Sequence, residues 1–340
     1  MQQRTLKRKS LPTQSKTPIR IWTTYNLALL RKTQELELRN RLGRALERKE
    51  QDLVEQRIAQ RIAEEKKSGR NTKRIQNTLI VHNSNGRPTQ ALKYENRVNA
   101  RERFALKQLA KTPLALKHSF DAKKGELAKE FIRGKIPEKL TPREIRTSVP
   151  ALLATMHRKQ YRKARFGLFA DREKTRKVGT FREAMRDFIM EVSARKTNPQ
   201  LTEKQNKFID SVLRTVWVNT QENPHLDRTD FRMILNDYSK NNMIRQRNGE
   251  IKFIDYGDLE INDPAKDLGG LFAKMRLTPK QQQTFVQSYS TLTGDKTIAN
   301  RVPLWLVVEE VRRLKKRKDL GQKGIQKKLA RIAQSLAQIK

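Results

Sequence analysis

Two carboxylates and one amide could form a metal-dependent catalytic site in this sequence of 340 residues. They are Asp237, Asn242 and Asp255, and an Asn248-Gly249 pair lies between the second and the third. Asn-Gly between two apolar segments is a strong hairpin signal. Such a hairpin brings the loop before its first strand beside the end of its second strand, so the three side chains should converge. Carboxylate and amide oxygens suit Mg²⁺, and the other carboxylate could orient an attacking hydroxyl.

Acidic residues are concentrated near this site, although the chain as a whole is short of them. The sequence holds 75 Lys and Arg against 36 Asp and Glu, which gives a formal net charge of +39 at pH 7. Against that trend, one short stretch holds Asp255, Asp258, Glu260, Asp263 and Asp267. A lone Asp or Asn in a loop is normally a turn residue. Acid gathered in so basic a chain instead indicates a local chemical role.

The spacing of these residues resembles that of the protein-kinase-like phosphotransferases of the aminoglycoside phosphotransferase and choline kinase type. Asp237 with Asn242 is similar to the family's catalytic loop, where a His-x-Asp motif precedes an Asn. Residues 254–258, Ile-Asp-Tyr-Gly-Asp, are similar to its metal-binding Ile-Asp-Phe-Gly-Asp, and residues 262–268 resemble its Gly-Asp-Pro-Ala-x-Asp-Leu helix start. The resemblance covers about residues 65–315. It implies an α+β, bilobal protein-kinase-like fold with a small sheet lobe and a helical lobe.

The resemblance implies a role for each residue of the acidic stretch. Asp237 would be the catalytic base or hydroxyl-orienting group, and Asn242 and Asp255 would hold Mg²⁺. Asp267 would brace the catalytic loop as structural support. Leu235 stands where the family has its loop His.

The same resemblance implies an ATP site in the small lobe, so that ATP and Mg²⁺ would be the cofactors. Lys93 would pair with the phosphates, and Glu102 on the following helix would hold that lysine. Gly69 would lie in the loop that covers the phosphates, and Glu130 would open the hinge that carries adenine. Without the family, Lys93 is equally a solvated lysine after a strand, and Glu102 equally a surface helix residue.

Hydrophobic periodicity predicts the elements that would position these residues. Residues 27–67 are charge-dense and have apolar residues at near-helical spacing, which predicts a long amphipathic helix packed along a neighbouring domain or a partner. The small lobe is predicted from two strands within 78–93, a helix at 101–109 and a strand at 127–132. The rest is predicted as helix interrupted by one hairpin. Helices are expected at 141–158, at 158–219 with breaks at Gly167 and Gly179, and at 264–340, and strands at 243–244 and 251–254.

These patterns divide the chain into a basic N-terminal tail and long helix (1–64), the small sheet lobe and hinge (65–134), the helical catalytic lobe (135–315) and a basic C-terminal extension (316–340). The two ends, residues 1–20 and 311–340, are rich in Lys and Arg and poor in acid. We expect that their removal would leave the fold and the nucleotide site intact.

Positive charge extends over the body of the chain as well as over both ends. So basic a surface attracts polyanions and repels cationic ligands, so nucleic acid (RNA or DNA) or a ribonucleoprotein is the expected partner. The basic segment 158–177 argues against a cationic acceptor such as an aminoglycoside or choline. An active phosphotransferase docked on such a partner is favoured. The alternative is a catalytically inactive, kinase-like structural subunit of a ribonucleoprotein or nucleic-acid assembly.

The composition also excludes several classes of protein. Because the sequence has no cysteine, disulfide frameworks, thiolate metal sites and cysteine nucleophiles are ruled out. Its apolar runs fall far short of the ~20 residues needed to span a bilayer, and the N-terminal residues lack the apolar region of a secretory signal. An intracellular, cytoplasmic protein is expected rather than a secreted one, and a mitochondrial location stays open.

Overall fold

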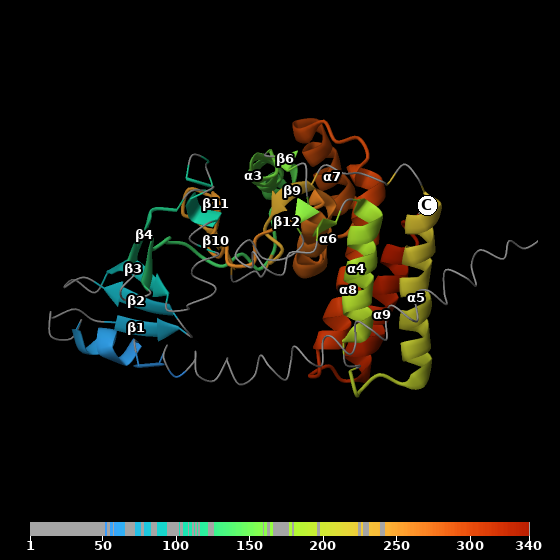
Figure 1. The fold of residues 1–340 in the computed structure, drawn as a ribbon, viewed down its shortest axis with the longest axis horizontal. Coiled ribbons are helices and arrows are strands. Elements are labelled where there is room, and N and C mark those ends of the chain that lie inside the picture. Colours follow the sequence, from blue (N-terminus) through green and yellow to red (C-terminus); the bar gives the residue numbers. More distant parts are fainter. Residues whose placement is uncertain are drawn as a thin grey trace, which may run out of the picture.

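A computed structural model shows a small sheet lobe and a larger helical lobe joined through a short linking segment (Figure 1). It describes residues 52–339 apart from 53–54, 57, 65–71, 76–77, 83–86, 94–101, 103–104, 108, 111, 113, 115, 122–125, 159, 162–163, 166–176, 179, 196–197, 224–225, 227–230 and 239–241. The bilobal α+β architecture predicted from the sequence is therefore confirmed.

The small lobe is built on a five-stranded antiparallel sheet in the order β1-β2-β3-β5-β4. Its strands are β1 (Thr72–Ile75), β2 (Thr78–His82), β3 (Pro88–Lys93), β4 (His118–Asp121) and β5 (Glu126–Glu130). The described residues between 52 and 64 are helical, and Ile58 of this helix packs with Val81 of β2 and Leu92 of β3. The predicted amphipathic helix is thus confirmed over its described part, and it packs on the sheet.

The link between the lobes is held by backbone contact with the catalytic hairpin. Lys135 and Arg245 form a β-bridge, in which each backbone N–H donates to the carbonyl of the other, at 2.9 and 2.8 Å. A Cβ on Gly134 would lie 2.3 Å from the carbonyl oxygen of Arg245, so this approach requires glycine. The linking segment is therefore fixed directly against the hairpin that carries the candidate site.

The helical lobe starts with a π-helical turn (Glu144–Ser148) that continues into α3 (Val149–Met156). Thr141 and Glu144 form a reciprocal cap, as the Thr141-Pro-x-Glu pattern predicts, with the Thr141 N–H donating to Glu144 at 2.6 Å. The other helices of this lobe are α4 (Phe181–Ala194), α5 (Glu203–Glu222), α6 (Pro264–Met275), α7 (Pro279–Thr293), α8 (Ile298–Lys316) and α9 (Gln322–Leu336). They enclose one large apolar core.

The prediction of helix from 158 to 219, broken at Gly167 and Gly179, is wrong in its first part. That part contains the short strands β6 (Gln160–Tyr161), β7 (Ala164–Arg165) and β8 (Lys177–Val178). Strands β9 (Phe231–Ile234) and β12 (Glu260–Asn262) were also missed, and they form a three-stranded sheet in the order β12-β9-β6. Strands of two to four residues are too short to show a sequence period, so their pairing is decided by tertiary contacts.

The C-terminal residues are part of the helical lobe, so the expectation that 311–340 could be removed without harm to the fold is wrong. Val311 and Leu314 of α8 are 0% exposed, and so are Ile325 and Ile332 of α9. All four belong to the main core. The helices of this segment bury an apolar face although the segment is rich in Lys and Arg, and composition alone does not show that face.

Some predictions concern residues outside the described part of the chain. These include the tail 1–20, the first part of the long helix and Gly69. Within the described residues, none of the helices is long and apolar enough to cross a membrane.

Candidate active site

A β-hairpin brings the predicted catalytic residues together. Strands β10 (Met243–Arg245) and β11 (Ile251–Phe253) pair in antiparallel register, with Met243 opposite Phe253. Gly249 adopts a positive φ of 83°, the left-handed conformation expected of the Asn-Gly turn. The hairpin predicted at this position is confirmed, and it carries Asn242 at one end and Asp255 at the other.

Hydrogen bonds tie these ends to the catalytic loop. The side-chain amide of Asn242 donates from Nδ2 to Oδ2 of Asp237 at 3.0 Å. The backbone carbonyl of Asn242 accepts the N–H of Ile254 at 3.0 Å, which places Asp255 next in the chain beside it. Asp255 in turn accepts the N–H of Gly257 through Oδ1 at 3.1 Å. The structure therefore brings Asp237, Asn242 and Asp255 to one place.

The chemistry of this group suits a magnesium ion. Because Asn242 uses its amide nitrogen on Asp237, its amide oxygen is directed away from that contact. Together with the carboxylate of Asp255, this oxygen offers the two hard ligands that Mg²⁺ commonly takes from a protein that also binds substrate phosphates. Clusters of three or more His, Cys, Asp or Glu with metal-site geometry are not found among the described residues, so an all-protein metal cage is not what this part of the chain provides.

Asp267 of α6 holds the backbone of the catalytic loop. Its carboxylate is fully buried and accepts the N–H of Leu235 at 2.8 Å and that of Asn236 at 2.9 Å. Asn236 has a positive φ of 60°, which asparagine tolerates better than most residues. Since this loop carries Asp237 as its next residue, the position of Asp237 depends on Asp267.

His157 completes this buried network, and sequence analysis had not given it a partner. Its Nε2 lies 3.0 Å from Oδ2 of Asp267 and its Nδ1 lies 2.7 Å from the hydroxyl of Tyr289. A neutral imidazole that donates from Nε2 and accepts the tyrosine O–H at Nδ1 satisfies both contacts. Burial, followed by nearby carboxylates, raises the pKa of Tyr289 well above its ordinary value, so Tyr289 keeps its donor hydrogen.

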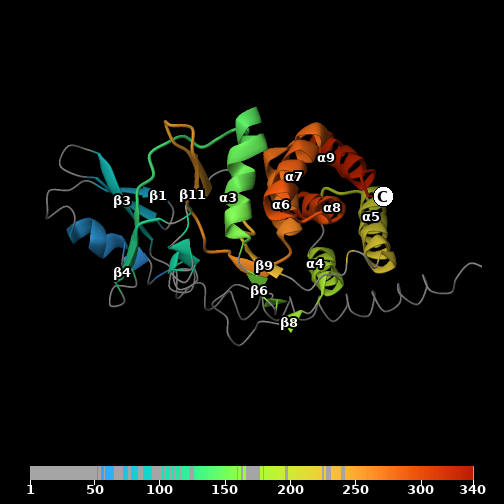
Figure 2. The ribbon, with the colours of Figure 1, turned by 90° about the horizontal axis from the view of Figure 1, so that it is seen from above.

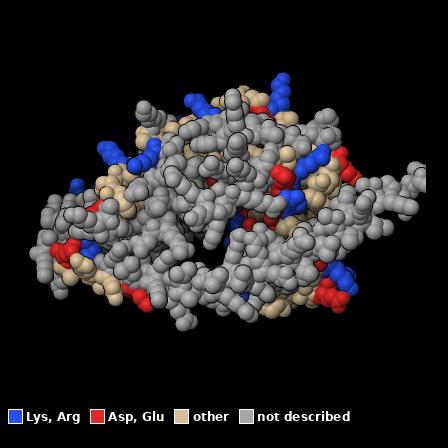
Figure 3. Space-filling view, viewed as in Figure 1, with Lys and Arg blue, Asp and Glu red and all other residues tan. Residues whose placement is uncertain are grey.

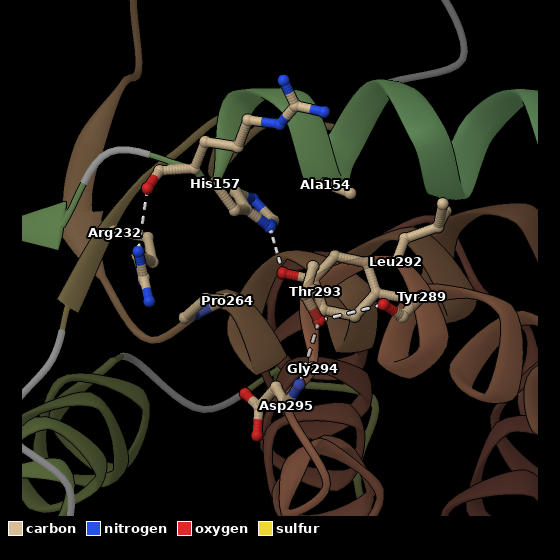
Figure 4. Close-up of a pocket in the computed structure, with 10 residues that line it drawn as sticks. Ala154, His157, Arg232, Pro264, Tyr289, Leu292, Thr293, Gly294 and Asp295 are labelled. Atoms are coloured by element: carbon tan, nitrogen blue, oxygen red, sulfur yellow. Dashed lines mark hydrogen bonds between the residues drawn. The ribbon is translucent and has the colours of Figure 1, made fainter.

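His157 also borders a cavity of about 330 Å³ behind the catalytic loop (Figure 4). Arg158, Arg232 and Asp295 are among the residues that line it, whereas Asp237, Asn242 and Asp255 are not. The imidazole thus separates this cavity from Asp267, and the cavity is not the site where the predicted catalytic groups meet.

The N-terminus of α6 is fixed by buried charge, which holds Asp267 in place. Asp263 caps the helix by accepting the N–H of Ala265 at 3.1 Å, and the buried Arg301 donates to the same carboxylate at 3.1 Å. Trp305 donates from its indole nitrogen to Asp263 at 2.9 Å. Trp305 is 0% exposed, as expected for a core residue rather than a stacking platform.

A lysine that sequence analysis missed contacts the residue predicted to hold the phosphate-binding lysine. The ammonium group of Lys129 on β5 donates to Glu102 at 2.6 Å and to the carbonyl of Ile254 at 2.8 Å. The three groups link the sheet, the helix after β3 and the loop of Asp255. Strand alternation was the available signal, because Lys129 lies on the same face of β5 as the buried Leu127.

Lys274 is a second missed residue, and it forms an ion pair with Asp237. Lys274 lies on α6 two helical turns after Asp267, so both residues occupy the same face of the helix. One residue on that face holds the loop backbone while the other contacts its carboxylate. Their spacing was visible in the sequence, but the contact with Asp237 was not.

The other predicted site residues are placed only in part. Lys93 ends β3 opposite Leu127 of β5, but its side chain lies outside the described part of the chain. Glu130 ends β5, and its carboxylate accepts the N–H of Lys117 at 3.1 Å. Gly69 is not described. The suggested pairing of Lys93 with Glu102 therefore stays a prediction, as does the adenine-binding role of Glu130.

Comparison with known proteins agrees with this geometry. A model of the phosphotransferase enzyme family matches residues 72–300. The choline kinase LicA from Streptococcus pneumoniae has a similar structure, at 20% identity and a TM-score of 0.52, covering 82% of this chain and 99% of that one. An aminoglycoside phosphotransferase from Alicyclobacillus acidocaldarius has 12% identity and a TM-score of 0.54, covering 79% of this chain and 90% of its own. No curated protein sequence matches.

Proposed function

Because the chain belongs to the phosphotransferase enzyme family, we propose that it transfers the terminal phosphoryl group of ATP to a hydroxyl of a polyanionic partner. The observation that carries this proposal is the contact of Asn242 with Asp237 on one side and with the Ile254–Asp255 backbone on the other. Phosphoryl transfer depends mainly on positioning and charge stabilisation, and this arrangement supplies both kinds of group.

In this proposal each residue of the site has a distinct task. Asp237 orients the acceptor hydroxyl and takes its proton, while Asp267 keeps the loop that carries Asp237 in place. Asn242 and Asp255 would hold Mg²⁺, which would supply positive charge for the phosphates of the nucleotide. Lys274 forms an ion pair with the carboxylate of Asp237 and thereby helps to fix its direction.

The small lobe would hold the nucleotide. Lys129 and Glu102 fix the helix after β3 against the Asp255 loop, which keeps the two lobes in register around the phosphates. Lys93 would contact the phosphates, Gly69 would lie in the loop that covers them, and Glu130 would mark the hinge beside adenine. Support comes from LicA, which has been solved in complex with AMP and aligns with 83% of this chain at a TM-score of 0.52.

The polyanionic partner is proposed from charge. The net charge of +39 favours nucleic acid or a ribonucleoprotein over a cationic acceptor. A sequence without cysteine also suits a reducing compartment such as the cytoplasm.

One observation favours the second candidate function, an inactive structural subunit of a nucleic-acid assembly. Leu235 stands where the family has its loop His, and the carboxylate of Asp237 is already in an ion pair with Lys274. In such a subunit the ion pair would only fix the loop. Measurement of ATP hydrolysis and of nucleotide binding separates the two functions.

The test measures thermal stability of the full chain with and without Mg²⁺-ATP. Nucleotide at 100 times its dissociation constant should stabilise the protein by about 2.7 kcal/mol, and Asp255→Ala should remove that increment. Glu250→Ala is the matched control, since Glu250 is an exposed acid of the same hairpin, and it should keep the full shift. No shift in the unmodified protein at millimolar Mg²⁺-ATP would contradict the proposal.

A further inference from the structure

Helices α6, α8 and α9 lie side by side at the C-terminal part of the helical lobe (Figure 2) and bring several cations together. Arg276 follows α6 directly, Arg313 lies near the end of α8, and Lys328 lies on α9. We call these three residues the Arg313 cluster. On the face shown in Figure 3, by contrast, described Lys and Arg side chains are interspersed with Asp and Glu.

The basic residues around the cluster have carboxylate partners. Arg312 pairs with Glu309 at 2.6 Å, Arg317 with Asp319 at 2.6 Å, and Arg331 with Glu310 at 2.5 Å. For Arg276, Arg313 and Lys328, the described residues provide no ion-pair partner. The acidic residues of this region thus form ion pairs with neighbouring arginines, and the positive charge of the cluster is not neutralised by them.

One cluster residue has an unmet hydrogen bond inside the protein. The Nη1 group of Arg313 is shielded from solvent and has no hydrogen-bond partner in the described structure. A buried donor of a charged group without a partner is costly, and natural proteins rarely keep one without a reason. An anion that reaches this group would satisfy it and neutralise the charge together.

Electrostatic repulsion among the residues of the cluster also favours the binding of an anion. Burial and, after it, the neighbouring arginines Arg313, Arg276, Arg317 and Arg331 together lower the pKa of Lys328 to about 8. Burial also lowers the pKa of Arg313, where nearby arginines add to the shift and Glu309 opposes it. Arg276 adopts a positive φ of 54°, at a helix end where glycine would be unstrained.

The cluster adjoins the catalytic loop. Arg276 comes two residues after Lys274, the lysine that contacts Asp237. Arg312, next to Arg313 on α8, has its pKa raised in part by the charge of Asp237. A strand bound on the cluster would therefore lie in the neighbourhood of Asp237.

We propose that the Arg313 cluster binds backbone phosphates of a single nucleic-acid strand, and that this strand is the polyanionic partner. This inference rests on the proposed function only where it takes Asp237 as the group that orients the acceptor hydroxyl. A single strand fits better than a membrane surface, because Arg313 and Lys328 are half-buried and a narrow strand can approach them where a flat layer of headgroups cannot. The contacts are to phosphates, so binding should depend little on base sequence.

The test measures the affinity of the full chain for a short labelled single-stranded RNA, and for DNA of equal length, over a range of salt. Arg313→Gln combined with Lys328→Gln should weaken binding about tenfold or more, since each loses a charge-assisted contact. The slope of log affinity against log salt should fall by about 1.4, which is about 0.7 for each phosphate contact.

The matched control removes the same charge elsewhere. Lys107→Gln with Lys204→Gln changes two exposed lysines of other helices and should alter affinity by less than about twofold, because salt screens distant charges. Equal losses in the two double variants would overturn the proposal, because charge alone would then explain binding. Absence of salt-dependent binding to RNA and DNA in the unmodified chain would overturn it as well.

A third variant protects the test against a folding defect. Arg276→Gly removes one cluster charge and relieves the positive φ of 54°, so it should weaken strand binding without lowering the melting temperature. Unchanged affinity in this variant and in the double variant would also overturn the proposal. The stability shift caused by Mg²⁺-ATP should persist in all of these variants. If the unmodified chain itself shows no such shift, the proposed catalysis is rejected, but the proposed binding of a strand to the cluster is not.

Discussion

The catalytic loop and the Arg313 cluster both lie next to α6, but they differ in whether their charged groups have partners within the protein. The carboxylate of Asp267 is 0% exposed and has two backbone N–H groups and His157 as partners. Arg313 has a shielded nitrogen without a partner and is surrounded by other cations. A charge whose partners all lie within the protein stabilises one conformation. A charge that lacks them gains its partner from a ligand.

Asp237 is an intermediate case between these two regions. Its carboxylate contacts Asn242 and Lys274, but the side chain remains 33% exposed. The protein therefore fixes the orientation of this carboxylate, which stays accessible to an acceptor. The difference among the three regions predicts different consequences when each is altered.

The largest effect is expected where all partners are internal. Asp267→Ala should lower the free energy of unfolding by about 3–5 kcal/mol, because it leaves buried donors unpaired. Urea unfolding measures this loss, and Glu203→Ala on the exposed start of α5 should change stability by less than about 0.5 kcal/mol. A loss of only about 1 kcal/mol in Asp267→Ala, near the average for any substitution, would show that the loop does not depend on this carboxylate.

A smaller effect, confined to chemistry, is expected at Asp237. Asp237→Asn keeps the size of the side chain but removes the group that takes the hydroxyl proton, so ATP hydrolysis should slow by about 100-fold or more. Nucleotide affinity, measured by the Mg²⁺-ATP stability shift, should be nearly unchanged. Equal loss of affinity would instead assign Asp237 to the metal site.

The smallest effect concerns the unpaired charge of the cluster. Lys328 has a pKa of about 8 in the folded protein against an ordinary value of 10.5. Between these values the unfolded chain binds a proton that the folded chain does not, so stability rises with pH through this window. The melting temperature of the unmodified protein, relative to Lys328→Met, should therefore increase from pH 8 to pH 10. A flat difference would show that burial and the neighbouring arginines do not lower the pKa of Lys328.

The catalytic hairpin was predictable because its signals are local. Asn248-Gly249 favours the turn that Gly249 adopts, and apolar residues on either side favour the two strands. Asp237, Asn242 and Asp255 lie close to this turn in the sequence, so their convergence followed from local geometry. The bilobal fold was predicted in another way, because it follows from the family resemblance and not from local geometry.

The contacts of Lys129, Lys274 and His157 were not predictable in this way. Lys129 meets a carbonyl 125 residues away, and His157 meets Asp267 at a separation of 110 residues. The strand pairing of β6, β9 and β12 has the same character, because each strand is too short to carry a period of its own. Such contacts depend on how helices and strands that are distant in the sequence pack against one another.

The sequence by itself determined the catalytic hairpin, the position of the acidic residues around its turn, and the excess of positive charge. Only the tertiary structure decided which charges are paired, because a carboxylate can satisfy whichever cation the packing places beside it. It also decided that the basic C-terminal residues belong to the core through Ile325 and Ile332. Local interactions select turns and helices, whereas the pairing of charges follows from distances that are set when α6, α8 and α9 pack together.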